Sequence, residues 1–353
     1  MVILVLVVWI IPKLILEIII IDWEYTCLKA VGLLSGGLDS TLAVKLMLEQ
    51  GFDIIAVNFT SPFCLCNSGG NCWALKVAKD FKIPIKVFNK GPDYLEVIKN
   101  PKYGYGSGMN PCIDCRIYML KKAKNYSKEI GAEFLFTGEV LDERPMSQNM
   151  RALKIIEKEV GLEDKIVRPL SAKLLPETEA ERMGWIDRKK LLNIRGRSRK
   201  KQIMSTKQLG IVDYPCPAGG CLLTYKEFAT KVRDLIYFRK RITTKDILLL
   251  KVGRHFRFGK SKIIVGRNET ENKRLLELSD KHDYLFEVPD LGSPITFLQG
   301  RKSKKAIELS AQLTARYSDA EGEEIPVKYY NKHSKHLIYV KPIEEDTLYK
   351  LRI

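Results

Sequence analysis

A glycine-rich turn between an apolar run and a helical pattern constrains the fold of this chain more than any other feature. Residues 28–34 are short and apolar, which is typical of a buried parallel strand. Apolar residues then recur at helical spacing until Gly51 ends the pattern. Glycines in such a turn let the backbone approach a ligand, and the helix N-terminus offers unpaired N–H groups. We therefore expect a phosphate site formed by Ser35, Gly36, Gly37, Asp39 and Ser40.

Residues 35–40, which read Ser-Gly-Gly-Leu-Asp-Ser, resemble the PP-loop of the ATP pyrophosphatase family. They lack the Lys-Ser/Thr pair that ends a Walker A loop. The resemblance implies that the chain binds ATP, adenylates a carbonyl-type oxygen and releases pyrophosphate, with Asp39 helping to place Mg²⁺. An ordinary strand-to-helix turn with a serine N-cap is the alternative.

Strand and helix patterns alternate through the first half of the chain. This alternation predicts a doubly wound α/β domain with a parallel sheet, of the PP-loop or HUP-like type, whose ligands bind at the carboxyl ends of the strands. Asn58 and Gly138 each follow an expected strand, so we expect both at the ATP site. The strands are expected at 28–34, 54–59, 85–88 and 134–137, and later helices at 73–81 and 113–130.

The chain is expected to contain more than one domain, because 353 residues exceed a typical single domain. Short helical patterns at 177–183, 187–194 and 199–209 follow the α/β alternation, and strand patterns dominate the last hundred residues. The expected segments are an apolar N-terminal segment (1–26), a PP-loop ATP-binding domain (27–172), a basic helical segment (173–245) and a smaller α+β domain (246–353).

The N-terminal segment is almost all Val, Ile and Leu, interrupted by Lys13 and Glu17. It approaches a membrane span in length, but it has two charges near its middle and no basic region before it. A membrane anchor, an extra element on the core and a stretch translated from a wrongly set start are three accounts. We favour the last, because the globular pattern begins after Cys27. No later segment reads as transmembrane, so we expect a cytoplasmic protein without a membrane partner.

The chain is strongly basic, with a formal net charge of +17 and a pI near 9.4. This charge predicts a polyanionic partner, for which nucleic acid is the first expectation and an anionic membrane surface the second. The cations are concentrated in residues 188–201, where no acid occurs, and a solvated helix face is the plainer account of that run. The expected phosphate-backbone contacts are Arg188, Lys189, Lys190, Arg195, Arg197, Arg199, Lys200 and Lys201.

Seven of the eight cysteines fall in three tight groups. An intracellular nucleotide enzyme does not use disulfides for stability, so this grouping indicates metal or redox chemistry. The first group could be a second metal site, a sulfur relay or a source of extra ligands. The groups are Cys64, Cys66 and Cys72; Cys112 and Cys115; and Cys216 and Cys221.

The second cysteine group opens the helix expected at 113–130. Cys112 and Cys115 lie one turn apart on one helical face, where they could chelate one metal centre. The helix dipole is expected to lower their thiol pKa. A zinc tetrathiolate of Cys112, Cys115, Cys216 and Cys221 is one interpretation of the pair of groups.

The string Asn110-Pro111-Cys112 resembles the Asn-Pro-Cys motif of tRNA 2-thiouridylases, specifically the forms that hold a [4Fe–4S] cluster on three cysteines. The resemblance implies that Cys216 or Cys221 supplies the third ligand, and we favour the cluster over zinc. Three ligands would leave one iron open for hydrosulfide. In the cluster-free thiolases one cysteine carries a persulfide and another resolves it, so sulfide and a persulfide carrier both stay open as sulfur donors.

The loop after the strand at 134–137 contains Gly138 and then Ser147-Gln148. It resembles the Gly plus Ser-Gln segment of the RNA-thiolating branch, which includes 4-thiouridine synthetases and 2-thiouridylases. The resemblance implies that Gly138 abuts the nucleotide and that Ser147 and Gln148 lie near the nucleotide and the tRNA base. A loop leading to a helix capped by Ser147 is the alternative.

The last hundred residues are expected to form a hairpin with its turn at Gly259-Lys260, then a helix at 269–279 and further strands. Residues 264–269, with Gly292-Ser293-Pro294, resemble the NFACT-type RNA-binding domain. That family has histidine at the position of Pro294, so a role of the family's histidine cannot be transferred to this chain. The expected phosphate contacts are Arg267 and Asn268. A protein–protein module is the alternative.

Together these features predict an ATP-dependent tRNA thiolase, which adenylates a uridine carbonyl oxygen and replaces it with sulfur. Positions 8, 34 and 54 of tRNA all stay open as targets. A PP-loop ligase or amidotransferase acting on a small carboxylate is a second hypothesis, which leaves the cysteines unexplained. A non-catalytic RNA-binding factor is a third, which leaves the intact PP-loop unexplained.

Overall fold

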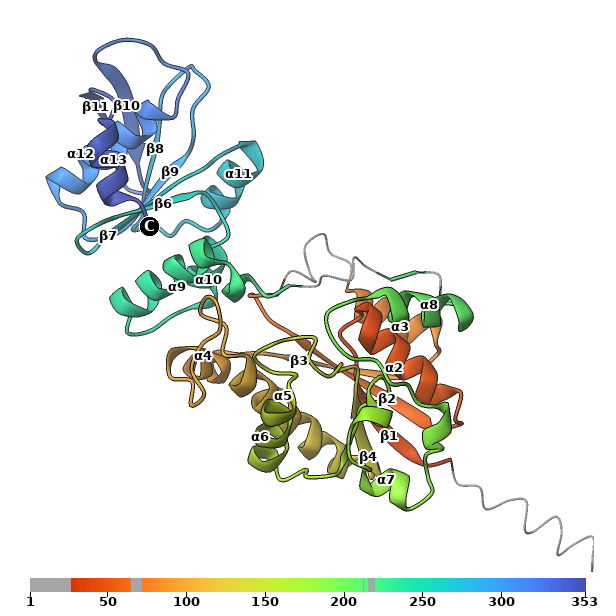
Figure 1. The fold of residues 1–353 in the computed structure, drawn as a ribbon. Coiled ribbons are helices and arrows are strands. Elements are labelled where there is room, and N and C mark those ends of the chain that lie inside the picture. The colour runs from red at the N-terminus through yellow and green to blue at the C-terminus, as the bar shows by residue number, and fades with distance from the viewer. Residues whose placement is uncertain (1–26, 65–71, 212, 215–219) are drawn as a thin grey trace, which may run out of the picture.

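The computed structural model of the protein describes residues 27–64, 72–211, 213–214 and 220–353. Its first half is a five-stranded parallel sheet in the order β3-β2-β1-β4-β5, with helices on both sides (Figure 1). The predicted doubly wound α/β fold is therefore confirmed. The strands are β1 (Lys29–Leu33), β2 (Asp53–Thr60), β3 (Ile85–Asn89), β4 (Phe134–Thr137) and β5 (Ile166–Val167).

Strand β1 lies at the centre of this sheet. Val31 is in register with Ile55 on β2 and with Leu135 on β4. Gly32 leaves room for the ring of Phe136 on β4, since a Cβ at that position would lie 2.3 Å from the tip of that ring. The turn that follows β1 is thus placed between the carboxyl ends of β2 and β4.

Helices cover the two faces of the sheet and form a core on each. Met47 and Val77 belong to one core, on the side of α2 and α3. Leu120 and Ile156 belong to the other, on the side of α5 and α6. The helices of this half are α2 (Leu38–Leu48), α3 (Trp73–Asp80), α4 (Pro92–Lys99), α5 (Cys112–Glu129) and α6 (Met150–Val160).

The chain from 173 to 245 forms short helices that pack against the first half. Leu191 and Ile194 enter the core of α2 and α3. The helix expected at 187–194 is wrong, because only Arg188–Lys190 turn as a 3-10 helix and the backbone N–H of Ile194 bonds to the carbonyl of Leu170 instead. The helices are η1 (Ala172–Leu174), α7 (Glu179–Arg182), η2 (Arg188–Lys190), α8 (Lys200–Gln208), η3 (Leu222–Thr224), α9 (Lys226–Phe238) and α10 (Thr244–Leu249).

A second, antiparallel sheet of six strands forms the C-terminal part, beyond α9 and α10 in Figure 1. The hairpin turn at Gly259-Lys260 is confirmed, since Phe258 pairs with Ser261. One face of the sheet packs on α12 and α13, and the other on α10 and α11. The elements are β6 (Arg254–Phe258), β7 (Ser261–Val265), α11 (Glu269–Glu277), β8 (Tyr284–Glu287), β9 (Thr296–Gly300), α12 (Lys304–Arg316), β10 (Ile325–Tyr330), β11 (Lys335–Val340) and α13 (Glu345–Leu351).

Within the described ranges, every helix is too short or too polar to cross a membrane. The hypotheses on the segment 1–26 concern residues outside that description.

Candidate active site

The turn after β1 is built as a phosphate cradle. Gly36 has φ +79°, and a Cβ there would lie 2.4 Å from the backbone nitrogen of Ala74, so this position needs glycine. The hydroxyl oxygens of Ser35 and Ser40 lie 3.0 Å apart, and the Ser40 hydroxyl donates to the Gly37 carbonyl at 3.0 Å. Gly37 is the N-cap of α2. The serine N-cap alternative is therefore wrong, and the first N–H groups of α2 are left for a ligand.

Two neighbouring strand ends close around this cradle. A Cβ on Gly138 would lie 2.6 Å from the backbone of Asp39 and Ser40, so the end of β4 touches the start of α2. The amide of Asn58 is buried and donates to the carbonyl of Leu34 at 2.7 Å, which fixes the end of β1 against β2. The structure thus brings Asn58 and Gly138 to the turn that the sequence singled out.

Two carboxylates and one guanidinium meet beside the cradle. Arg199 donates to both oxygens of Glu143, at 2.7 and 2.8 Å, and also pairs with Asp39. Glu143 is 5% exposed. Burial, and then the charge of Asp39, raise the pKa of Glu143 to about 7, although the charge of Arg199 opposes the rise. The structure therefore places Arg199 on carboxylates, whereas the sequence suggested an RNA phosphate.

Asp39 and Glu143 could together bind a divalent cation. Carboxylate oxygens are the ligands that Mg²⁺ prefers. Asp39 Oδ1 is buried and has no hydrogen-bond partner among the residues that the structure describes. Sequence reasoning missed Glu143, whose signal is an acid that follows Gly138 by five positions in the loop at the sheet edge.

Ser147 and Gln148 are buried inside their own loop. The side-chain oxygen of Gln148 accepts from the backbone N–H of Arg144 at 3.1 Å. Asn149, not Ser147, caps α6, because its side chain accepts from the N–H of Ala152 at 2.9 Å. The cap alternative for Ser147 is therefore wrong, and Gln148 shapes the loop that carries Glu143.

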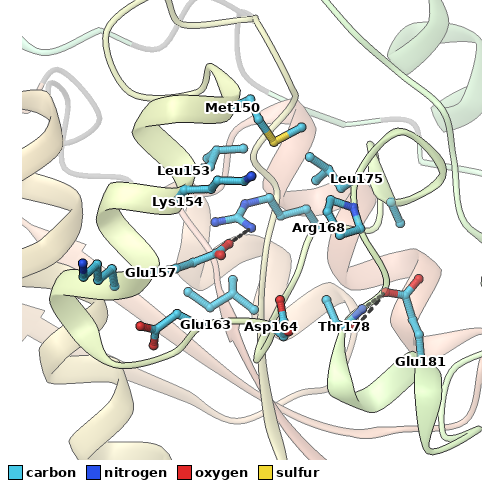
Figure 2. A pocket seen from close by; sticks show the side chains of 14 residues that line it. Met150, Leu153, Lys154, Glu157, Glu163, Asp164, Arg168, Leu175, Thr178 and Glu181 are labelled. Atoms are coloured by element: carbon cyan, nitrogen blue, oxygen red, sulfur yellow. Dashed lines mark hydrogen bonds and ion pairs between the residues drawn. The ribbon is translucent and has the colours of Figure 1, made fainter.

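An ion-pair network lies behind this loop and borders a cavity of about 330 Å³ (Figure 2). Arg168 is almost fully buried and pairs with Glu139, at 3.0 Å, and with Glu157. Burial opposes the charge on Glu139, but Arg116 and Arg168 hold its pKa below the usual range. Nη2 of Arg168 has no hydrogen-bond partner within the described chain. The network fixes the end of β4 to β5, and no feature of the sequence pattern had indicated it.

The second cysteine group opens α5, as predicted. Cys112 accepts from the amide of Asn110 at 3.1 Å. Cys115 accepts from Lys90 at 3.1 Å and from the hydroxyl of Tyr94 at 3.2 Å. The expected lowering of the thiol pKa is wrong for Cys112, because burial raises it.

Cysteines of the first and third groups lie near the start of α5, and a further cysteine of the first group lies near the cradle. Cys64 and Cys221 face each other as an antiparallel bridge. Cys221 packs in the same core as Cys115, and burial, followed by the charges of Cys115 and Cys112, raises the pKa of Cys221 to about 11. Cys72 instead precedes α3 and packs in the core of α2 and α3.

The fit of these thiols to a metal centre is partial. Thiolates are the ligands of iron–sulfur clusters and of structural zinc. Within the described ranges, however, no three His, Cys, Asp or Glu side chains are arranged to share one metal ion. Cys66 and Cys216 lie outside those ranges. The structure thus brings together some of the cysteines expected to hold a cluster, but the described residues do not form a complete set of metal ligands.

The expected RNA contacts differ in what surrounds them. Arg188 is partly buried and pairs with Glu181 at 2.7 Å, whereas Arg195 pairs with Asp142 at 2.6 Å but stays 67% exposed. Arg267 pairs with Glu271 at 3.0 Å, and Asn268 caps α11. The remaining cations of residues 188–201 are exposed: Lys189, Lys190, Arg197, Lys200 and Lys201.

Two protein families match separate parts of the chain. Residues 25–173 match the family described as thiamine biosynthesis protein (ThiI), and residues 253–352 match the NFACT protein RNA binding domain. These matches confirm the resemblance of the first half to PP-loop proteins and of the last hundred residues to the NFACT-type RNA-binding domain.

The curated relatives and the solved structures match this chain at low sequence identity or over only part of its length. The tRNA-specific 2-thiouridylase MnmA of Clostridium acetobutylicum is 34% identical over 31% of this chain and 35% of its own length. The MnmA of Listeria monocytogenes is 19% identical over 89% of this chain and 88% of its own length. A 4-thiouridine synthetase solved with RNA and ATP is 21% identical and has a TM-score of 0.37, over 63% of this chain and 52% of that one. The chain thus spans about a third of the first of these relatives.

Proposed function

We propose that this chain, which joins a ThiI-type PP-loop domain to an NFACT-type RNA-binding domain, is an ATP-dependent tRNA thiolase that acts in the cytoplasm. In the proposed reaction a uridine carbonyl oxygen attacks the α-phosphate of ATP, and pyrophosphate leaves. Sulfide sulfur then attacks the activated carbon, and AMP leaves. The names of the curated relatives, which are tRNA 2-thiouridylases, support this substrate class.

One observation carries the proposal: the phosphate cradle and the thiols lie at the same edge of the sheet. Cys64 follows the carboxyl end of β2, and the cradle follows the carboxyl end of β1 beside it. Arg144 links the two sites, because its guanidinium lies 3.9 Å from Glu143 and its charge acts on Cys112. A thiol-borne sulfur would therefore reach an adenylated base from the same edge of the sheet.

The chain's own residues have separate proposed roles. Ser35, Gly36, Gly37 and Ser40 hold the phosphates through backbone N–H groups and hydroxyls. Asp39, joined by Glu143, would hold Mg²⁺, which would supply positive charge beside the leaving pyrophosphate.

Arg199 bridges the two carboxylates in the structure. If these carboxylates held Mg²⁺, the guanidinium would be available to contact the phosphates. Gly138, Asn58, Ser147 and Gln148 shape the nucleotide and base site, as the resemblance implied.

We further propose that Cys112, Cys115 and a thiol of the third group, Cys216 or Cys221, hold a [4Fe–4S] cluster. A cluster with one open iron would supply a site for hydrosulfide. Zinc on the same thiols is the competing possibility. Anaerobic purification followed by iron and acid-labile sulfide analysis separates the two, since the cluster predicts about four of each per chain and zinc predicts neither.

The proposed RNA partner is tRNA, held by exposed cations of residues 188–201 and by the C-terminal domain. The test combines purified protein, Mg²⁺, ATP, sulfide and an unmodified tRNA transcript under anaerobic conditions. The proposal predicts AMP, pyrophosphate and a thiolated uridine in equal amounts. AMP and pyrophosphate without any thiolated nucleoside would show that the adenylated substrate is not a tRNA uridine.

A further inference from the structure

The hairpin of β10 and β11 ends the second sheet and carries a basic, aromatic surface. β11 is the edge strand, paired antiparallel with β10 (Figure 1). Residues 325–341 contain four lysines, two histidines and three tyrosines, and no aspartate or glutamate. Positive charge interleaved with flat rings is the composition by which proteins bind single-stranded nucleic acid.

One face of this hairpin belongs to the protein core. Val327 is fully buried there, and Ile338 packs against the core of α12. Tyr329 stacks on Phe286 with ring centroids 5.4 Å apart. These side chains are held inside the domain, so this face is closed to a partner.

The opposite face is exposed along β11, whereas Tyr330 of β10 packs against the core of α10 and α11; we call this side the hairpin face. Lys328 lies opposite Leu337 and Tyr330 opposite Lys335 in the register, so all four project to the same side, as does Tyr339 two residues beyond Leu337. Tyr339 is 63% exposed and Leu337 54% exposed. The ammonium group of Lys328 lies 5.2 Å from the ring centroid of Tyr330 and pairs with Glu287 of β8 at 3.1 Å, so this lysine is held within the face.

We propose that the hairpin face binds single-stranded RNA, with a base stacked on Tyr339 and phosphates contacted by Lys335. An exposed ring on a sheet can stack only on a base that has left its own stack, which excludes the interior of a duplex. The proposal rests on the RNA-binding half of the proposed function. It adds the face and the form of the RNA, neither of which the domain match assigns.

A second copy of the chain, pairing with the exposed edge of β11, is the competing occupant. Lysines on an edge strand and beside it disfavour such pairing, because they repel a like-charged edge. Lys332 and Lys335 lie at the tip of the hairpin, with His333 between them. The same charges attract phosphate, so the composition favours RNA over a copy of this chain.

The test measures fluorescence anisotropy of full-length protein with labelled oligouridine of about 12 nucleotides, within the site size of single-strand-binding folds, and with a duplex of the same length. Tyr339→Ala should weaken oligouridine binding about 5- to 150-fold, and Tyr339→Phe should keep it. Lys335→Ala should reduce the slope of log K against log salt by about 0.7. Tyr349→Ala is the matched control, because Tyr349 is 61% exposed on α13, on the other side of the sheet.

Three results would overturn the proposal. The first is that the Tyr339→Ala and Tyr349→Ala proteins bind oligouridine with equal affinity and have equal Tm values. Duplex binding that is as tight as oligouridine binding and equally sensitive to Tyr339→Ala is the second. A change of oligomeric state in Tyr339→Ala with unchanged RNA binding is the third, and it would make the hairpin face a protein interface. The assay contains no ATP or sulfur source, so a failure of the thiolation proposal leaves its outcome unaffected.

Discussion

Glu143 is expected to make the stability of the PP-loop domain depend on pH. Its carboxyl is buried and faces Asp39, and its pKa is raised from 4.5 to about 7. The folded state therefore binds more protons than the unfolded state between those two pH values. The contribution of this raised pKa to the free energy of unfolding is fully present below about pH 4.5 and is lost as the pH rises toward about 7. Glu143→Gln, which mimics the protonated acid, should remove this loss.

The size of the effect follows from how far the pKa of Glu143 is raised. A tenfold change in proton affinity corresponds to about 1.4 kcal/mol, so the variant should gain about 2 to 3 kcal/mol over the wild type between about pH 5 and about pH 8.5. For a domain of 150 to 250 residues, about 1 kcal/mol moves Tm by about 2–4 °C. The expected gain in Tm is therefore about 5–10 °C at the higher pH, and it should be small at the lower pH.

The assay is a thermal melt of both proteins, without nucleotide or Mg²⁺, at several pH values across this range. The reasoning predicts that the difference in Tm grows with pH in favour of Glu143→Gln. A variant that is less stable than the wild type at about pH 8.5 would refute it. That result would mean that the two hydrogen bonds from Arg199 outweigh burial and the charge of Asp39.

Three further predictions concern the core, the cradle and the thiols. Arg168→Met should lower the free energy of unfolding by about 3–5 kcal/mol, because it removes the cation that Glu157 pairs with and leaves the buried Glu139 with Arg116 alone. Arg182→Met at a half-exposed pair should cost less than about 1 kcal/mol, and equal losses would contradict this. Gly138→Ala should abolish ATP binding measured by calorimetry, since its Cβ would enter the PP-loop backbone, and unchanged affinity would argue against that packing. In metal-free protein at about pH 8, Cys221 should alkylate at least about tenfold more slowly than exposed Cys27, because burial raises its pKa to about 11; mass mapping that finds the reverse order would count against the burial.

The sequence predicted the elements whose signal is local. β1 and β4 are continuous apolar runs, and the hairpin turn at Gly259-Lys260 is set by its own residues. β5 has only two residues, which is too short for a periodic pattern. The segment 187–194 has helical composition, but its backbone bonds to the chain near Leu170, a contact that sequence spacing does not show.

The features of the candidate site also differ in whether they could be predicted from local sequence. The cradle could be predicted because its phosphate-binding groups lie within six consecutive residues. The bridge from Arg199 to Glu143 and Asp39 could not, since it joins side chains 56 and 160 positions apart. The pairing of Cys64 with Cys221 likewise depends on a backbone bridge between distant loops. The pKa of Cys112 rises instead of falling, because burial outweighs the hydrogen bond from Asn110 and the charges of Arg116 and Arg144.

The central claim is that the chain replaces a uridine oxygen of tRNA with sulfur. Its most direct test is nucleoside mass analysis of tRNA from a strain that lacks this gene, complemented with the wild-type protein or with Asp39→Asn. The account predicts that one thiolated uridine disappears in the deletion strain, returns with the wild-type protein and stays absent with the variant. An unchanged set of thiolated nucleosides in the deletion strain would contradict it.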